Sequence, residues 1–306
     1  MQLREELTGA IDSRLTIADC TESFPQVGDV KSGIPHLNCG YNRLGMLGYV
    51  ITTAALAAAA SAGYQSMAPT GQWYGTTFTG SGGGAKQLAL TYDDGPNDPH
   101  TLRLLEVLAK HEVRATFFLI GRYAQQRPDI VRAVLEGGHV IGNHTYSHRL
   151  LTFRSAAQIR AELEMCRRAL SDAIGEHSNL FRPPFGGRRP AVLRIARHLG
   201  LAPVMWSVTG YDWNAPPADE IERKVTHRVR GGDVILLHDG GHLEMGADRS
   251  ATVTATDRLI AKYQSEGRQF VTIPAMMEAL TAGRRTTTGR EPGPTPTDSE
   301  GRSRVG

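Results

Sequence analysis

The chain is poor in cysteine and in net charge, and it has no internal repeat. Its three cysteines, Cys20, Cys39 and Cys166, lack the spacing of a metal site, and their odd number argues against a disulfide framework, although Cys20 could pair with Cys39. The formal charge is only +3 over 306 residues, and the lysines and arginines are scattered along the chain. This composition argues against a nucleic-acid-binding protein.

What the chain does have is a hydrophobic fraction of 40%, which is ample for a buried core. Composition divides the sequence into five parts: a polar segment 1–43 expected to be disordered, an apolar segment 44–63, a Gly/Ser/Thr-rich linker 64–85, a folded domain 86–282, and a tail 283–306 expected to be disordered. The chemistry of the protein is therefore expected within residues 86–282.

The apolar segment carries no charge and follows Arg43 directly. Its length suits a signal peptide or a membrane anchor, and Ala60–Ala62 offers a small-residue cleavage site. Its alanine content leaves a soluble helix as the alternative, and Met46 could be a later start. We expect an extracytoplasmic protein, secreted or membrane-anchored, with a cytoplasmic one as the alternative. The sequence does not decide whether the segment is cleaved.

Within the folded region, apolar strand-like runs alternate with amphipathic helical patterns. The expected strands are 87–92, 115–120, 139–142, 180–182, 202–208, 233–238 and 269–273. The expected helices include 99–110, 155–174, 191–199, 219–230 and 251–266. This alternation predicts an α/β fold with a parallel sheet that closes, or nearly closes, into a barrel, and an open doubly wound sheet is the alternative.

Polar side chains follow five of these strands. The sequences are Asp93-Asp94, NHTYSH from residue 143, RPPFGG from residue 182, TGYDW from residue 209 and LLHDGGH from residue 236. The C-terminal ends of parallel strands share one rim of a barrel, where enzymes of this architecture place their chemistry. We therefore expect one site built from these five loops.

His144 and His148 stand four residues apart, a spacing that on a helical turn brings two imidazoles to one face. With a carboxylate from the pair after the first strand they make three protein ligands. A catalytic zinc site uses this number and leaves a position for water. Five other histidines lack such company and are interpreted as structural or solvated: His111, His139, His177, His198 and His227.

In their order and spacing, TYDDGP, HTYSH, RPPFG, YDW and LLHD resemble the five motifs of the NodB-type polysaccharide deacetylases, carbohydrate esterase family 4, over residues 86–280. The resemblance implies a distorted (β/α)7 barrel and metal-dependent hydrolysis of an acetamide on an N-acetylglucosamine-type sugar. It also implies that Asp94, His144 and His148 bind the divalent metal, with zinc expected and cobalt or nickel also suited to these ligands.

The resemblance further implies the catalytic roles. Asp93 is expected to be the general base, and His238 the general acid that protonates the amine leaving group. Arg182 would hold the base ionised, while Asp212 would orient His238 and raise its pKa. The backbone N–H that follows the two prolines of RPPFGG, at Phe185, would face the developing oxyanion.

Three residues are expected at the substrate by the same resemblance. Trp213 and Leu236 would pack against the acetyl methyl group and the sugar ring. The family commonly has Tyr where this chain has Phe185, and a second carboxylate shortly before Asp212 is missing here, which we interpret as a difference in substrate. Asp239 is interpreted as structural.

The expected function is N-deacetylation of peptidoglycan or chitin-like glycans with release of acetate. The first alternative is an O-acetyl xylan esterase that uses the same metal site, and the second is a carbohydrate-binding protein without turnover. The expected partners are an acetylated glycan and, if 44–63 anchors the chain, a membrane. The glycan, the native metal and the oligomeric state are left open by the sequence.

Overall fold

The structure is a computed structural model that describes residues 43–175 and 178–288. The predictions for the polar N-terminal segment therefore lie outside the described residues, except at Arg43. The chain divides into two compact units between Thr52 and Thr53, and the structure describes only the start of helix α1 (Arg43–Met67) in the first. Among the described residues, one helix, Met46–Met67 within α1, is long and apolar enough to cross a membrane.

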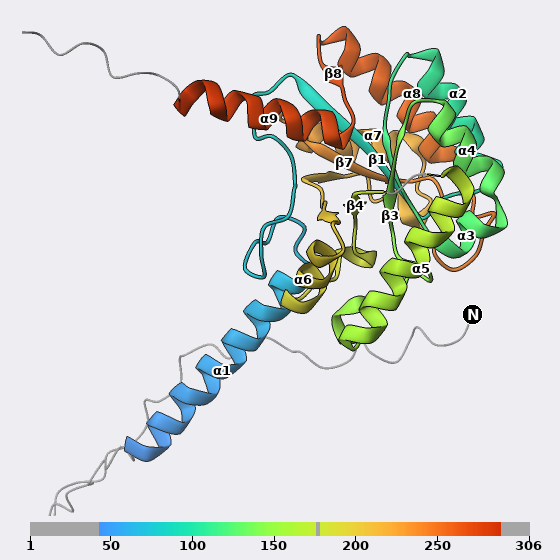
Figure 1. The fold of residues 1–306 in the computed structure, drawn as a ribbon. Helices are drawn as coiled ribbons and strands as arrows, with labels where there is room; N and C mark the ends of the chain where they lie inside the picture. Colours follow the sequence, from blue (N-terminus) through green and yellow to red (C-terminus); the bar gives the residue numbers. More distant parts are fainter. Residues whose placement is uncertain (1–42, 176–177, 289–306) are drawn as a thin grey trace, which may run out of the picture. The chain divides into compact units, whose positions relative to one another are not determined.

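The second unit is built on a sheet of parallel strands that curls into a half-barrel (Figure 1). Across the sheet the order is β5-β4-β3-β2-β1-β7-β6, and β8 pairs with the start of β1. The expected parallel α/β sheet is thus confirmed. Its barrel is distorted, because the end strands β5 and β6 are not paired with each other. The strands are β1 (Gln87–Asp93), β2 (Thr116–Leu119), β3 (Val140–Asn143), β4 (Leu180–Phe181), β5 (Ala202–Pro203), β6 (Val208–Thr209), β7 (Val234–His238) and β8 (Gln269–Phe270).

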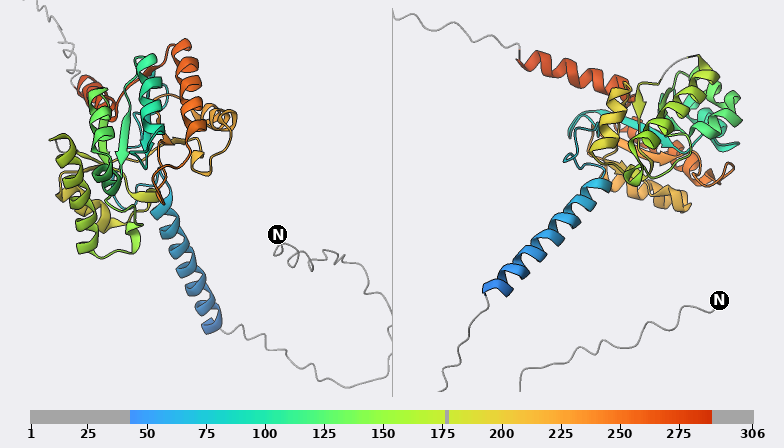
Figure 2. Two further views of the ribbon diagram at one scale, coloured as in Figure 1. Left: turned by 90° about the vertical axis from the view of Figure 1, so that its right-hand side faces the viewer. Right: turned by 60° about the horizontal axis from the view of Figure 1, so that its bottom comes forward.

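Most helices pack around the outside of this sheet, as Figures 1 and 2 show. They are α2 (His100–Lys110), α3 (Gly121–Gln126), α4 (Pro128–Glu136), α5 (Ala156–Ile174), α6 (Pro190–His198), α7 (Ala218–Arg228) and α8 (Ser250–Ser265). The start of α9 (Ile273–Thr288) instead packs with Ala89, Phe118 and Val234, on the other face of the strands. In the described part of the chain, three short 3-10 turns lie in loops: η1 (Leu151–Phe153), η2 (Pro184–Gly186) and η3 (Asp212–Asn214). The sequence predicted α2, α5, α6, α7 and α8 but not the short helices α3 and α4.

The α5 segment illustrates why the helical predictions succeeded. Ser155 caps its N-terminus and forms a reciprocal capping box with Gln158. Ile159, Leu163 and Leu170 recur at helical spacing, and all three are buried. By contrast, every residue of β1 after Gln87 is buried, because a central parallel strand is covered on both faces.

Two strand predictions were wrong. The run 202–208 is not one strand but β5 and β6, because its backbone changes partners along the way. Val204 N–H donates to Phe181 O, Met205 N–H to Phe78 O, and Ser207 N–H to Val234 O. The last predicted strand, 269–273, was also too long, because helix α9 begins at Ile273. This helix continues to Thr288, past the expected end of the domain at 282.

Part of the segment expected to be a linker contacts the sheet. Phe78 forms a parallel β-bridge with Val204, and Gly80 forms an antiparallel bridge with Asp233. Thr77 is buried, and its N–H donates to the side chain of Gln72. Residues 77–80 therefore connect the backbone just after β5 to the residue just before β7.

Candidate active site

The sheet register brings two distant motifs together at the C-terminal rim. Asp93, the last residue of β1, lies directly opposite His238, the last residue of β7. The next residue, Asp94, has φ of 74°, so its side chain leaves the strand in a different direction from that of Asp93. The two neighbouring carboxylates can therefore serve different partners.

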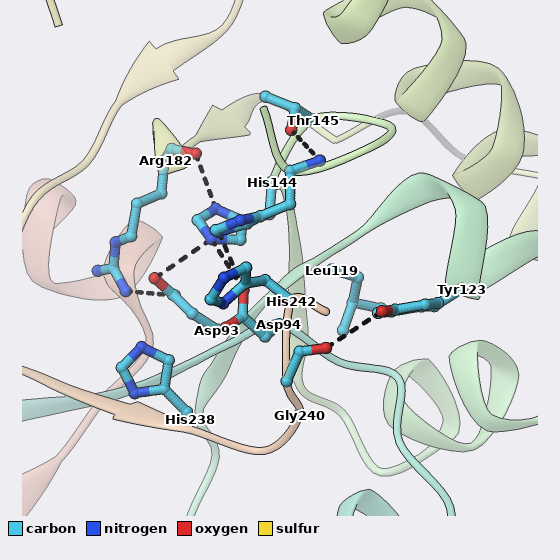
Figure 3. Close-up of polar contacts among 12 residues, drawn as sticks. Asp93, Asp94, Leu119, Tyr123, His144, Thr145, Arg182, His238, Gly240 and His242 are labelled. Atoms are coloured by element: carbon cyan, nitrogen blue, oxygen red, sulfur yellow. Dashed lines mark hydrogen bonds and ion pairs between the residues drawn. The ribbon is translucent and has the colours of Figure 1, made fainter. Parts of the chain in front are cut away.

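Asp94, His144 and His148 form a buried group whose potential ligand atoms all lie within 4.8 Å of one another. Figure 3 shows Asp94 and His144 of this group beside Asp93 and Arg182. Asp94 Oδ1 lies 3.1 Å from His148 Nε2 and 3.5 Å from His144 Nε2. The expectation that the two histidines share a helical turn was wrong. They stand on an irregular loop after β3, in which Thr145 and His148 have φ of 66° and 56°.

The surroundings of this group fit a cation. His144 Nδ1–H donates to Arg182 O over 2.8 Å, which leaves Nε2 free to act as a ligand. Asp94 Oδ1 is buried without a hydrogen-bond partner among the described residues. Such an orphaned polar atom is costly unless a further group satisfies it, and an oxygen with two imidazole nitrogens is a donor set that suits a divalent metal.

The electrostatics of the group also suit metal binding. Burial by itself raises the pKa of the Asp94 carboxyl, but the neighbouring imidazoles of His144 and His148 hold that pKa well below its usual range. Burial and the neighbouring His144 lower the pKa of His148 to about 3. At neutral pH Asp94 is therefore ionised and His148 is neutral, the protonation states that metal binding requires. Burial lowers the pKa of His144, but the charge of Asp93 raises it above its ordinary value, so binding of a metal to His144 would release its proton.

Asp93 belongs to a second buried pair. Its Oδ1 accepts a hydrogen bond of 2.7 Å from Arg182 Nη1, and Arg182 is fully buried under the sheet rim. The same guanidinium donates to Thr91 Oγ1 over 2.9 Å and to Met205 O over 3.0 Å. Burial lowers the pKa of Arg182, and the charge of Asp93 counters that effect. The pair therefore keeps Asp93 oriented, with Oδ2 left 3.6 Å from His144 Nε2.

His238 and Asp212 form the third pair. His238 Nδ1 lies 2.8 Å from Asp212 Oδ1, and its backbone N–H donates to Asp212 Oδ2 over 2.7 Å. Thr252 Oγ1 also donates to Asp212 Oδ2, over 2.9 Å. Burial alone lowers the pKa of His238, but the carboxylate of Asp212 raises it to about 9. His238 is thus held protonated, with Nε2 turned away from Asp212 and available as a donor.

All three groups border one pocket of about 670 Å³. The residues expected at the substrate, Phe185, Trp213 and Leu236, line it as well. Phe185 and Trp213 remain about half exposed, at 47% and 43%, so each offers a ring face to a ligand. The Trp213 ring stands edge-on to His238, with centroids 5.7 Å apart. The structure therefore gathers every expected site residue, while their individual roles stay predictions.

The sequence assigned no role to several other pocket residues. His242, the last residue of LLHDGGH, lies with its ring 4.8 Å from His148 and 5.1 Å from Phe185. Trp206 and Asn214 also line the pocket. The motif pattern contained His242, but only its position beside the metal group indicates a contribution to the pocket.

The remaining histidines lie apart from this group. His139 Nδ1 accepts a hydrogen bond from Ala115 N–H, and His111 contacts Asp257. His198 and His227 are exposed, and His177 lies outside the described residues. Asp239 is buried and accepts a hydrogen bond of 2.6 Å from Thr101 Oγ1.

Comparisons with known proteins agree with this geometry. The family model described as polysaccharide deacetylase matches residues 80–204. The chitooligosaccharide deacetylase of Sinorhizobium fredii is 39% identical over 207 residues, which cover 66% of this chain and 96% of that protein.

Two solved structures are also similar. The Bc1960 peptidoglycan N-acetylglucosamine deacetylase matches with a TM-score of 0.61 at 36% identity, over 65% of this chain and 91% of that one. BA3943 of Bacillus anthracis, a pseudoenzyme of carbohydrate esterase family 4, matches with a TM-score of 0.59 at 28% identity, over 64% of this chain and 66% of that one. Since a relative of this identity is matched over nearly its whole length, this chain belongs to the polysaccharide deacetylase family, carbohydrate esterase family 4.

Proposed function

We propose that this protein is a metal-dependent N-deacetylase that hydrolyses the N-acetyl group of N-acetylglucosamine units in a glycan. One observation carries the proposal: a buried carboxylate–arginine pair, a metal-type triad and a carboxylate–histidine pair border the same pocket. Together they supply a base, a cation site and an acid. These are the three groups that hydrolysis of an unactivated amide needs.

The cation would be held by Asp94, His144 and His148. When bound, a divalent metal supplies a Lewis acid for the acetyl carbonyl and lowers the pKa of water toward about 7. Zinc is our first choice for these ligands, and cobalt or nickel would also suit them. His144 is the best oriented ligand, because Arg182 O fixes its Nδ1–H.

The chain's own residues would then move the protons. Asp93, held by Arg182, accepts a proton from the attacking water as the new C–O bond forms. His238, held protonated by Asp212, donates a proton to the amide nitrogen as the C–N bond breaks. The products are acetate and the free amine of the sugar. Trp213 and Leu236 would bound the acetyl group, and the Phe185 N–H would face the oxyanion.

The substrate proposal is a peptidoglycan or chitin-like glycan. It is supported by relatives whose names specify peptidoglycan N-acetylglucosamine and chitooligosaccharides. Such polymers lie outside the cytoplasm, and helix α1 offers an apolar span of suitable length. We therefore propose an extracytoplasmic catalytic domain that α1 tethers to the membrane.

Two other functions compete with this one. An O-acetyl esterase would use the same metal site. It would depend less on protonation by His238, because an ester has a better leaving group than an amide. A glycan-binding protein without turnover is the other, and one of the similar structures is described as a pseudoenzyme of this family. The complete set of acid, base and triad residues favours turnover here.

The test is acetate release by the full chain in detergent, after chelation and zinc re-addition, on N-acetylglucosamine oligomers, peptidoglycan and acetylated xylan. We expect zinc-restored release from the amino sugars. Asp93→Asn should lower this release about 100-fold or more, because the proton acceptor is lost, while zinc binding persists. Asp98→Asn, at an exposed carboxylate after the same strand, is the matched control. Release from xylan alone would favour the esterase, and none from any substrate at full zinc occupancy would favour a binding protein.

A further inference from the structure

Long parts of this sequence contain no acidic residue. No aspartate or glutamate occurs in residues 43–92, 137–161 or 177–211, whereas the second and third stretches contain several arginines each. The formal charge of +3 conceals this separation, because the acidic residues are concentrated elsewhere in the chain.

The three stretches meet on one side of the catalytic domain. Arg188 donates from its backbone N–H to Ser66 O over 3.0 Å and from its side chain to Ala68 O and Gly71 O over 2.5 and 2.7 Å. Arg189 donates to Thr152 O and to Arg154 O over 2.9 and 2.8 Å. We call the surface formed by residues 64–77, 149–154 and 188–198 the basic face.

The arginines of the basic face lack acidic partners. No ion pair among residues 43–175 and 178–288 involves Arg149, Arg154, Arg189, Arg194 or Arg197. Arg149, Arg194 and Arg197 are exposed, on the loop after β3 and on helix α6. A surface that carries arginines without neighbouring carboxylates to neutralise them attracts an anionic partner.

Large apolar rings are exposed on the same face. Tyr64 is 69% exposed, Trp73 is 68% exposed and Phe153 is 86% exposed. Tryptophan and tyrosine are enriched where a membrane meets water, and basic side chains near them bind anionic headgroups. Rings and arginines together favour a lipid surface over a soluble polyanion, which would leave the rings in water.

The basic face is continuous with both helix α1 and the catalytic pocket. Met67, the last residue of α1, is soon followed by Ala68 and Gly71, whose carbonyl oxygens accept hydrogen bonds from the Arg188 side chain. Gly186 lines the pocket, and a Cβ there would lie 3.6 Å from Met67 O. The end of the apolar span therefore touches the loop that carries Phe185, with no free linker between them.

We propose that the basic face lies on an anionic phospholipid surface and holds the catalytic pocket next to the bilayer. This inference rests on the proposed anchoring by α1. The accessible substrate is then the glycan that lies against the membrane, rather than strands far out in the wall.

The test uses the full chain in vesicles made with brominated lipids, which quench tryptophan fluorescence at the membrane. We compare vesicles of phosphatidylcholine alone with vesicles that contain about one third phosphatidylglycerol. We expect stronger quenching in the vesicles that contain phosphatidylglycerol. Most of the quenching should be lost in Trp73→Phe. The double variant Arg154→Glu/Arg194→Glu should reduce the gain from phosphatidylglycerol about twofold or more, and 1 M salt should do the same because it shortens the Debye length to about 3 Å.

Arg103→Glu/Arg223→Glu is the matched control, because both arginines are exposed on α2 and α7, away from the basic face. It should leave the quenching unchanged. Flotation of the vesicles after a high-salt wash reports separately on α1. A chain that does not float contradicts the proposed anchoring. If the chain floats but its quenching is the same with and without phosphatidylglycerol, and the same in Arg154→Glu/Arg194→Glu, the proposal that the basic face lies on the membrane is wrong while the anchoring by α1 stands. Charge-dependent binding of soluble polyphosphate without quenching by the vesicles would contradict that proposal in the same way.

Discussion

The site contains two histidine–carboxylate groups that the protein treats in opposite ways. His148 lies beside Asp94 and another imidazole, and burial with that neighbour lowers its pKa to about 3. His238 is equally enclosed, but both oxygens of Asp212 bond to it, and its pKa rises to about 9. The same side chain is therefore neutral at pH 7 in one place and protonated in the other, which suits the metal-ligand and general-acid roles proposed for them. The partner decides, rather than the residue type.

The largest effect should come from breaking the ligand side of this comparison. His148→Ala removes one of three ligands, and the loss of several kcal/mol of transition-state stabilisation should lower the rate more than about 1000-fold. Zinc content by mass spectrometry should fall with it. His238→Gln, its counterpart, should lose activity but keep the metal. Equal zinc loss in both variants would contradict the division of roles.

An intermediate effect should come from the acid side. Asp212→Asn removes the charge that raises the pKa of His238, so that pKa falls. Because the general acid works only when protonated, the rate should then decline at a lower pH. The loss should be about 10-fold or more at pH 8 and smaller at pH 6. A kcat profile that drops uniformly at all pH values would indicate that Asp212 acts through structure rather than charge.

The smallest effect should come from the outer partner of Asp212. Thr252→Val preserves shape but removes the hydrogen bond to Asp212 Oδ2. We expect a stability loss of about 1 kcal/mol, measured as a lower Tm, and a slight shift of the alkaline limit in the same direction as in Asp212→Asn. Thr254→Val, an exposed position on the same helix, is the control. A pH profile identical to wild type would show that Thr252 does not help to hold the pair.

The candidate metal site, Asp94, His144 and His148, shows which features the sequence predicted correctly and which it did not. The spacing of His144 and His148 indicated a shared site, but the helical turn expected for it does not exist. The loop instead places His148 at a positive φ, which spacing cannot reveal because it depends on tertiary contacts. His242 was missed for a similar reason, since only the folded loop brings its ring to His148.

The order of the motifs and the alternation of strands and helices were determined by the sequence itself. Hydrophobic periodicity and turn chemistry act over a few residues and can be read locally. Only the tertiary structure decided that Asp93 lies opposite His238, and that residues 77–80 form β-bridges to Val204 and Asp233. It also decided that arginines scattered along the chain gather on one face. Such pairings join residues far apart in the chain, and their free energy depends on the path of the whole backbone.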